Sequence, residues 1–420
     1  MSLSAAISSA VSGLNAQSAA LASVSNNLAN SSTVGYKSGD TSFASLVTGT
    51  ATKTTSTGGV ISSARSNVDL QGLLTTSTVS TNMAISGNGM FVVAGDSNSS
   101  DLLYTRNGEF TVDSEGYLVN NGYYLQGWKT DASGNVIGGT SASSLSAIDT
   151  DGIASVAAAT TTSSMTANLP AEAEVGATFT SSLELYDSLG TAATTTVTWT
   201  KTAENTWSIA FSDPTLSSDP TQAIGSVTSS DITVNFNDDG TLASTSPATP
   251  SLTIAGWTTG AATSAVTLNL GEAGSASGLS QYSSSASTPT VSVTSTQDGM
   301  RYGSLSGIDI GDDGTVFASY SNGTQIAVYK VAVATFSNTN GLTAQSGGLY
   351  SANNASGSAT FKLSGQDGAG TIFGSQLEAS TTDTNSEFSR MMAAQQAYSS
   401  AAQAITAANA MFDTLISAVR

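Results

Sequence analysis

The chain has 420 residues, of which 30 are acidic and 11 are basic, so its formal net charge at pH 7 is −19. This balance argues against the clustered lysine and arginine surfaces that bind nucleic acid or anionic membranes. The chain contains no histidine and no cysteine, which excludes Ser-His-Asp triads, thiolate chemistry, disulfides and most zinc sites. We therefore expect no nucleic-acid partner, no cofactor and no metal, and an enzyme would have to use carboxylates.

The N-terminal residues do not have the pattern of a secretory signal peptide. The first charged side chain is Lys37, so no basic region precedes the apolar residues. No run of 18 apolar residues occurs, and we expect no membrane insertion. A hydrophobic fraction of 39% is enough to build packed cores in a chain of this length.

Residues 1–30 have the heptad spacing of a helix that packs against a partner. Residues 2–36 contain no charged side chain, whereas an ordinary coiled coil carries Glu and Lys beside its seam. Two interpretations remain open: a helix docked on the body of its own chain, or a helix whose small outer faces pack against copies of itself. The predicted assembly seam comprises Leu3, Ile7, Leu14, Leu21, Val24 and Leu28.

Residues 31–69 form a predicted connector, together with residues 366–383. The stretch 38–66 is rich in Ser, Thr and Gly, and we expect it to be loosely structured.

The middle of the chain has the pattern of short strands broken by tight turns. Asn-Gly pairs, which favour β-hairpin turns, occur at residues 88–89, 107–108, 121–122 and 322–323. All six prolines lie between Pro170 and Pro289. We therefore expect a mainly-β wall domain (70–144 and 289–365) that carries an inserted outer β-domain (145–288). The strand candidates are 90–93, 195–200, 251–254, 291–294 and 325–336.

The sequence contexts of the acidic residues in this region are more typical of β-turns than of metal or catalytic sites. The segments 309–314 and 237–240 faintly resemble calcium loops, but 309–314 lacks the closing glutamate of such a loop, and both are expected to be β-turns. Glu172 and Glu174 could pair for glycoside hydrolysis, yet a solvated strand face explains them equally well. The four tryptophans are scattered and are expected in cores.

The C-terminus mirrors the N-terminus. Thr384 and Glu387 have the spacing of a capping box that opens a helix, and residues 391–412 contain no charged side chain. The predicted seam of this helix comprises Phe388, Met391, Tyr398, Ile405, Phe412 and Ile416. The predicted fold is thus multidomain, with a terminal α-helical coiled coil (1–30 and 384–420) and mainly-β middle domains, nested by pairing of N- and C-terminal segments.

Several blocks resemble the bacterial flagellar rod and hook protein family. Residues 12–16 and 26–37 resemble its N-terminal signature, and residues 87–93 and 104–110 resemble its next two blocks. Residues 185–190 and 299–323 look like the hook members of the family. The sequence departs from the family at 379–383 and at 395–398, where an arginine is usual and Gln396 stands here. The family-motif residues are Asn26, Asn27, Leu28, Ala29, Asn30, Gly35, Tyr36 and Lys37.

The resemblance implies a non-enzymatic structural subunit of the flagellar hook, outside the cell. Such subunits form a helical tube that acts as a universal joint from rod to filament and encloses the export channel. It also implies self-polymerisation and contacts with the distal rod, hook cap, hook–filament junction and hook-length control proteins and with the flagellar type III export apparatus. The segment with Phe43 and Val47 resembles the hydrophobic segment that the export gate recognises in this family. The alternative is that these two side chains pack within the connector. The alternatives are a distal rod protein, and a secreted β-rich adhesin or polysaccharide-binding protein.

Overall fold

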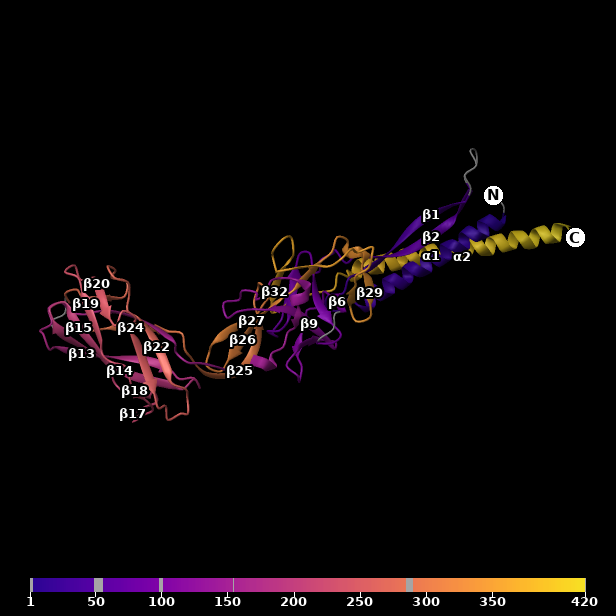
Figure 1. Ribbon diagram of the computed structural model, residues 1–420. Helices are drawn as coiled ribbons and strands as arrows, with labels where there is room; N and C mark the ends of the chain where they lie inside the picture. Colours follow the sequence, from indigo (N-terminus) through magenta and orange to yellow (C-terminus); the bar gives the residue numbers. More distant parts are fainter. Residues whose placement is uncertain (1–2, 49–55, 98–100, 154, 285–289, 420) are drawn as a thin grey trace. The chain divides into compact units, whose positions relative to one another are not determined.

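Figure 1 shows the computed structural model of the protein, which describes residues 3–48, 56–97, 101–153, 155–284 and 290–419. The chain divides into two compact units. Unit 1 comprises Met1–Gly152, Gly307–Ala318 and Gln325–Arg420, and unit 2 comprises Ile153–Ser306 and Ser319–Thr324. In the described part of the chain, no helix combines the length and the apolar character needed to cross a membrane.

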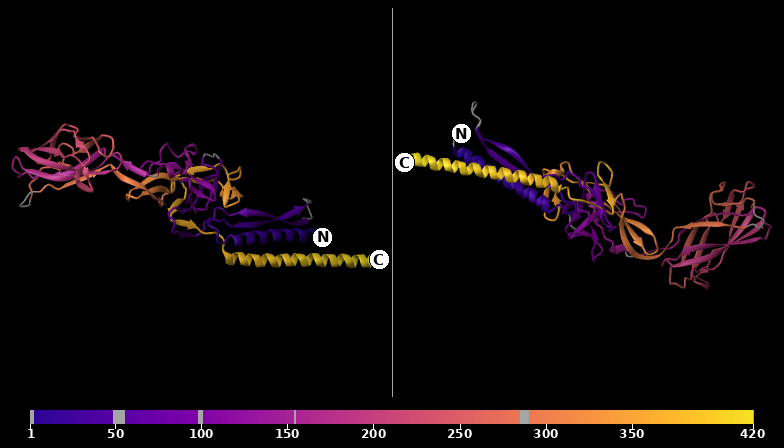
Figure 2. Two further views of the ribbon diagram at one scale, coloured as in Figure 1. Left: turned by 90° about the horizontal axis from the view of Figure 1, so that it is seen from below. Right: turned by 180° about the vertical axis from the view of Figure 1, so that it is seen from behind.

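Two long helices in unit 1 run antiparallel beside each other (Figure 2). Helix α1 spans Leu3–Ala29 and helix α2 spans Thr384–Val419, as the heptad spacing predicts. The predicted capping box is wrong by one residue. The Asp383 carboxylate accepts hydrogen bonds from the backbone N–H groups of Asn385 and Ser386 at 2.9 and 3.3 Å. A short, charged acceptor satisfies these N–H groups and the helix dipole together.

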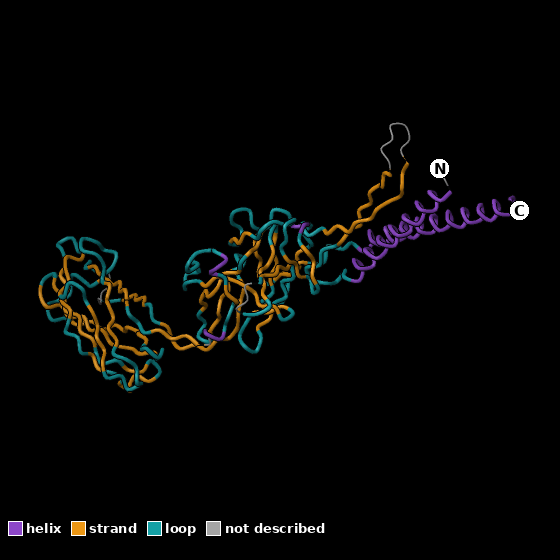
Figure 3. The backbone as a smooth tube through the Cα atoms, turned by 45° about the vertical axis from the view of Figure 1, so that its right-hand side comes forward, coloured by secondary structure: helices purple, strands orange, loops and turns teal. Residues whose placement is uncertain are grey.

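The expectation of a loosely structured stretch over residues 38–66 is also wrong for residues 39–48 and 56–66, and residues 49–55 lie outside the described part of the structure. Strands β1 (Gly39–Thr48) and β2 (Ser56–Ser66) form an antiparallel hairpin, which lies along α1 (Figure 3). The N–H of Val60 donates to the Ser12 hydroxyl of α1 at 3.1 Å. Thr, Val and Phe favour extended backbone, and α1 supplies a surface that the sequence alone does not place there.

The β-body of unit 1 is built around β5 (Met90–Ala94), which pairs with β6 (Leu102–Thr105), β9 (Tyr123–Lys129) and β28 (Val333–Thr335). Segments far apart in the sequence also pair: β3 (Leu74–Thr76) lies beside β33 (Gln376–Glu378), and β4 (Met83–Ser86) lies beside β32 (Thr371–Gly374). The other strands of this body are β3 (Leu74–Thr76), β4 (Met83–Ser86), β6 (Leu102–Thr105), β7 (Thr111–Val112), β8 (Leu118–Asn120), β9 (Tyr123–Lys129), β10 (Ser146–Ala147), β27 (Gln325–Val331), β28 (Val333–Thr335), β29 (Thr343–Gln345), β30 (Leu349–Ser351), β31 (Thr360–Lys362), β32 (Thr371–Gly374) and β33 (Gln376–Glu378). Short 3-10 helices span Ala142–Ser144, Asp151–Ile153 and Thr339–Gly341.

The predicted strand over residues 325–336 is divided at Ala332. Before this residue the chain pairs with β9 (Val331 opposite Gly127), and after it the chain pairs with β5 (Val333 opposite Phe91). The chain therefore changes partner in the middle of one apolar run, which a strand periodicity does not reveal.

Of the four Asn-Gly pairs named above as turn candidates, three lie at bends between strands and one does not. Asn121 and Gly122 both have positive φ between β8 and β9, as a hairpin turn of the favoured type requires. Gly108 instead passes close to another strand and accepts a hydrogen bond from Met83 N–H at 3.0 Å. A Cβ at Gly108 would lie 1.6 Å from the Met83 carbonyl oxygen, so glycine is needed for close approach rather than for a turn.

Unit 2 consists of two sheets whose buried faces share one core. Alternate residues of β14 and β22 are buried, as expected for sheets with one solvated face. Trp199, Trp207 and Trp257 lie in this core, and Trp128 lies in the core of unit 1, which confirms the expectation for the tryptophans. One sheet comprises β12 (Thr162–Asn168), β18 (Ser226–Val227), β21 (Ser251–Ala255), β22 (Ser264–Asn269), β23 (Leu279–Ser280) and β24 (Val293–Gln297). The other comprises β13 (Thr178–Tyr186), β14 (Ala192–Ala203), β15 (Thr206–Phe211), β16 (Thr215–Leu216), β17 (Asp219–Ala223), β19 (Ile232–Phe236) and β20 (Leu242–Ser246).

Three further strands complete the element order: β11 (Ser155–Ala158), β25 (Met300–Ile310) and β26 (Thr315–Tyr320). The residues of β25 and β26 are shared between the two units. The turn between these strands confirms the turn interpretation, since Asp313 Oδ1 accepts from Thr315 N–H at 2.9 Å. Asp239 does the same for Thr241. Glu172 and Glu174 lie in the loop after β12, not on a strand. Among the described residues, no group of three or more acidic side chains is arranged to hold a metal ion.

Candidate assembly interface

The buried apolar residues of helices α1 and α2 have small side chains. Four of them are at most 6% exposed: Ala16 and Val24 of α1, and Ala394 and Ala408 of α2. On α2 the buried residues Glu387, Ala394 and Ala408 lie at multiples of seven residues from one another, and Ala401 between them is half-buried. Because alanine adds little bulk, two helices with such faces can approach closely.

Most residues of the predicted seam lie outside this buried face. Phe388, Tyr398 and Ile416 of α2 are 50%, 43% and 61% exposed. The side chain of Leu3 lies outside the described part of the structure. Val24 is buried, and the half-buried seam residues are Ile7, Leu14, Leu21, Leu28, Met391, Ile405 and Phe412. The chain by itself therefore leaves large apolar side chains of α2 in solvent.

The side chain of Asn27, a residue of the family motif near the end of α1, makes four hydrogen bonds. Its amide N–H₂ donates to the Gly39 carbonyl at 2.7 Å and to Glu387 Oε1 at 3.2 Å. Its carbonyl oxygen accepts from Gly39 N–H at 2.9 Å and from the Tyr36 hydroxyl at 3.2 Å. The side chain is 1% exposed, so this one residue joins α1, the first residue of β1 and the start of α2.

The rest of the motif shapes the turn that follows α1. Asn30 donates to the Asn26 carbonyl at 2.9 Å and accepts from the Thr33 hydroxyl. Gly35 has a φ of +68°, and a Cβ there would lie 2.6 Å from the backbone nitrogen of Asn107. Both the backbone conformation and the close approach require glycine. Leu28 is half-buried and Ala29 is exposed.

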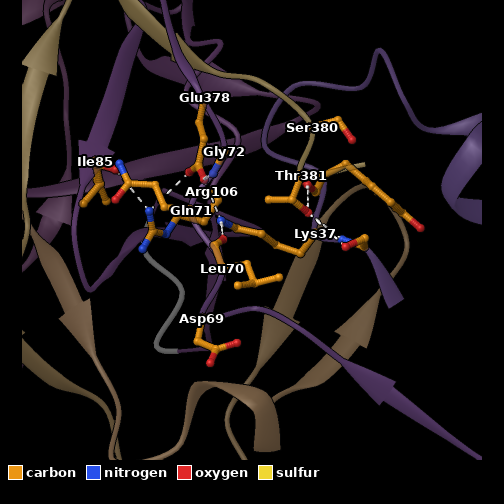
Figure 4. Close-up of polar contacts among 12 residues, drawn as sticks. Lys37, Asp69, Leu70, Gln71, Gly72, Ile85, Arg106, Glu378, Ser380 and Thr381 are labelled. Carbon is orange, nitrogen blue, oxygen red and sulfur yellow. Dashed lines mark hydrogen bonds and ion pairs between the residues drawn. The ribbon is translucent and has the colours of Figure 1, made fainter. Parts of the chain in front are cut away.

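Lys37 ends the motif in a buried ion cluster (Figure 4). Its ammonium lies 2.6 Å from Glu378 Oε1, and both side chains are 0% exposed. Arg106 Nη1 lies 3.2 Å from Glu378 Oε2. Lys37 also donates to the Leu70 carbonyl, and Gly72 N–H donates to Glu378 Oε1. Three segments that are far apart in the sequence thus converge on one carboxylate.

The electrostatics of this cluster fit a structural anchor. Burial lowers the pKa of Lys37, and the nearby Arg106 lowers it further, while Glu378 opposes both effects. Burial also lowers the pKa of Arg106, again opposed by Glu378. Arg106 also donates through Nη1 to the Ile85 carbonyl and through Nη2 to the Gly87 carbonyl. Since both oxygens of Glu378 already accept hydrogen bonds, we interpret the cluster as an anchor that holds these segments together.

Sequence reasoning missed Arg106 and Glu378 as members of this cluster. The isolation of Lys37 in the sequence could have indicated a special role, since it is the only charged residue in positions 2–39. Phe43 of β1 is 47% exposed, and the side chain of Val47 lies outside the described part of the structure.

Comparison with known proteins gives matches to flagellar proteins along the chain. Four family models match: "Flagella basal body rod protein" at residues 7–37, "Flagellar hook protein FlgE/F/G D1 domain" at 84–156, "Flagellar basal body protein FlaE D2 domain" at 156–300, and "Flagellar basal body rod FlgEFG protein C-terminal" at 375–418. The flagellar hook protein FlgE of Brucella suis is 32% identical over 426 residues, which cover all of both chains. The chain belongs to the flagellar hook protein family.

Two further similar proteins support the membership of this family. The flagellar hook protein FlgE of Escherichia coli K12 is 32% identical, with 98% of this chain and 99% of that protein covered. The crystal structure of Helicobacter pylori flagellar hook protein FlgE2 matches with a TM-score of 0.54 at 14% identity. That match covers 73% of this chain and all of the solved chain, and it supports the mainly-β multidomain fold.

Proposed function

We propose that this protein builds the tube of the flagellar hook by joining copies of itself through α1 and α2. As a member of the flagellar hook protein family it is a structural subunit of the hook, not an enzyme, and it works outside the cell in the bacterial flagellum. The observation that carries the proposal is the apolar surface of α2, where Phe388 and Ile416 are at least half exposed. Neither alternative, a distal rod protein or a secreted adhesin, is favoured, because the full-length relatives are hook proteins.

In this proposal the exposed seam residues complete a coiled coil between neighbouring copies. Heptad positions bury their apolar side chains only against a partner helix, and isolated helices are marginal in water. The uncharged faces of α1 and α2 would line the export channel, where exported chains of either sign pass without strong ion pairing.

We also infer a nested order of domains. The terminal helices (1–30 and 384–420) are followed outward by the connector (31–69 and 366–383), the wall domain (70–144 and 289–365) and the inserted outer domain (145–288). Pairing of β3 with β33 and of β4 with β32 supports this order, and so does the Lys37–Glu378 ion pair. A tube built in this way transmits torque while bending, as a universal joint requires.

Beyond its own copies, the proposed partners are the distal rod, hook cap, hook–filament junction and hook-length control proteins. We propose that the flagellar type III apparatus exports the chain and recognises the segment around Phe43 and Val47. The exposure of Phe43 supports a role in binding.

Polymerisation of the purified full-length chain tests the proposal. Leu14→Asp and Ile405→Asp each place a carboxylate in the seam, where burying an unpaired charge costs several kcal/mol. We expect both variants to stay monomeric in sedimentation and to form no tubes in electron micrographs, with unchanged circular dichroism of the β-body. The control is Ser218→Asp, at an exposed loop position, which should polymerise normally. Tubes from either seam variant would contradict the proposal.

A further inference from the structure

The two blocks that resemble the hook members of the family, residues 185–190 and 299–323, meet in unit 2. The backbone N–H of Tyr302 in β25 donates to the Gly190 carbonyl at 3.1 Å. Gly190 has a φ of +76°, and a Cβ there would lie 2.4 Å from the Tyr302 nitrogen and 3.0 Å from Ala157 Cβ of β11. Glycine is needed at this position, because the turn after β13 touches the backbone of β25.

This contact falls on a β-bulge. Strands β11 and β25 pair antiparallel, and their register shifts between Val156 and Ala158. Over this step β11 advances by two residues and β25 by three, from Gly303 to Met300. Strand β25 therefore carries one extra residue here, and such a bulge bends the strand and interrupts the ladder. The turn after β13 accepts the N–H of Tyr302, which lies within this bulge, and so gives the bulge a partner outside the ladder.

The bulge lies in the strands that connect unit 2 to unit 1. The chain enters unit 2 at Ile153, just before β11, and leaves it after Ser306, within β25. We refer to residues 155–158 and 300–306 as the connecting ribbon. Strand β11 is the edge strand of its sheet, and a pair of short strands is only marginally stable by itself. Contacts from outside the ladder therefore affect how stiff the connecting ribbon is.

The turn that contacts the connecting ribbon is itself fixed by a buried carboxylate. Asp187 is 0% exposed, and its Oδ1 accepts from the backbone N–H groups of Leu189 and Thr191 at 2.9 and 2.8 Å. Its Oδ2 accepts from the Thr259 hydroxyl at 2.7 Å. Hydrogen bonds to an ionised acceptor are stronger than neutral ones. Since Thr259 lies in the loop between β21 and β22, the turn is tied to both sheets of unit 2.

We propose that residues 187–190 act as a brace that stiffens the connecting ribbon by holding its bulge. Loss of the brace leaves the Tyr302 N–H without this acceptor and allows β11 and β25 to move more freely. The connecting ribbon carries force between the two units of one subunit, so the brace sets how readily the subunit yields when the tube bends. The effect on bending rests on the proposed function, whereas the effect on the ribbon is a property of the single chain.

Hydrogen exchange in the full-length chain tests the brace directly. Gly190→Ala places a Cβ against the Tyr302 nitrogen and should raise the exchange rate of the Tyr302 amide about tenfold, as loss of one net hydrogen bond predicts. The matched control is Gly274→Ala. Gly274 has a similar φ of +79°, and a Cβ there would meet no described atom within 4 Å apart from its chain neighbours. Equal exchange at Tyr302 in the two variants would overturn the proposal.

Thr259→Val tests the brace without touching the connecting ribbon. It removes the hydroxyl that donates to Asp187 Oδ2 and leaves Gly190 in place. Exchange of the Tyr302 amide should rise, but by less than in Gly190→Ala. Thr258→Val, at the exposed neighbouring position, is the control and should not change this rate. If Gly190→Ala does not fold, Thr259→Val decides, and an unchanged rate at Tyr302 in that variant contradicts the proposal.

Bending of the polymer tests the mechanical consequence. In electron micrographs, polymers assembled from the Gly190→Ala or Thr259→Val chain should have a shorter persistence length than polymers of the wild type or of Gly274→Ala. Unchanged stiffness in both brace variants would contradict the mechanical role. A wild-type chain that never polymerises would contradict the proposed function instead, because the exchange experiment needs only the single chain.

Discussion

The side chain of Asn27 and the backbone of Gly39 exchange two hydrogen bonds, one in each direction, at 2.7 and 2.9 Å. The amide of Asn27 thereby pairs with the first residue of β1 much as a neighbouring strand would. It fixes the point at which the chain leaves α1 and enters the hairpin.

Replacement of Asn27 by alanine should loosen α1. The change leaves the half-buried N–H and carbonyl of Gly39 without these partners, and we expect a loss of about 2 kcal/mol in the free energy of unfolding. Hydrogen exchange in α1 and β1 should rise, with little change in unit 2. Asn26→Ala, at an exposed motif position, is the matched control. Equal exchange in the two variants would rule out the junction role.

Removing one partner of the Lys37–Glu378 pair should lower the free energy of unfolding more than replacing both partners together. Lys37→Met alone leaves a buried carboxylate with Arg106 as its one remaining cation, and we expect a loss of about 3–5 kcal/mol in chemical denaturation. The double variant with Glu378→Gln should recover part of that loss. As a control, Asp313→Asn removes an ion pair whose carboxylate is 59% exposed and should cost less than about 1 kcal/mol. Additive single effects would contradict coupling.

Tyr350 should make the fold sensitive to alkali. Burial raises the pKa of Tyr350 to about 12, and the neighbouring Tyr36 and Glu378 add to the effect. A raised pKa contributes stability that is fully present below the unfolded value of about 10 and is lost as pH rises toward 12. Between these values, thermal unfolding should show a smaller decline for Tyr350→Phe than for the wild type. Parallel declines would show that Tyr350 is not responsible.

Trp207 should stabilise unit 2 alone. It is 0% exposed, its indole N–H donates to Gln281 Oε1 at 2.8 Å, and its core contains residues of unit 2 only. Trp207→Ala should cost about 3–5 kcal/mol through the cavity that it leaves. Calorimetry should show two transitions, with only one of them shifted. A common shift of both transitions would contradict independent units.

Local patterns account for what could be predicted from the sequence. The ends of α1 and α2 follow from spacing, and the turn at Asn121 follows from residue chemistry, because both signals lie within a few neighbouring residues. The pairing of residues 39–48 with residues 56–66 could not be predicted, since their Ser- and Thr-rich composition is also typical of loops and α1 supplies their support. Lys37 and Glu378 are 341 positions apart, and no local pattern brings them together. Gln325–Val331 ends where the chain changes partner strand, which also depends on distant residues.

The burial of Lys37 has a consequence for the environments in which the subunit works. Lys37 is the only charged residue in positions 2–39, and its ammonium is enclosed by Glu378 and carbonyl groups. Helix α1 itself contains no charged side chain, so the surface that it would offer to a neighbour holds no side-chain charge for dissolved salt to screen. In the proposed assembly, contacts through this helix are apolar or neutral, and a change from fresh water to brine does not weaken them by screening.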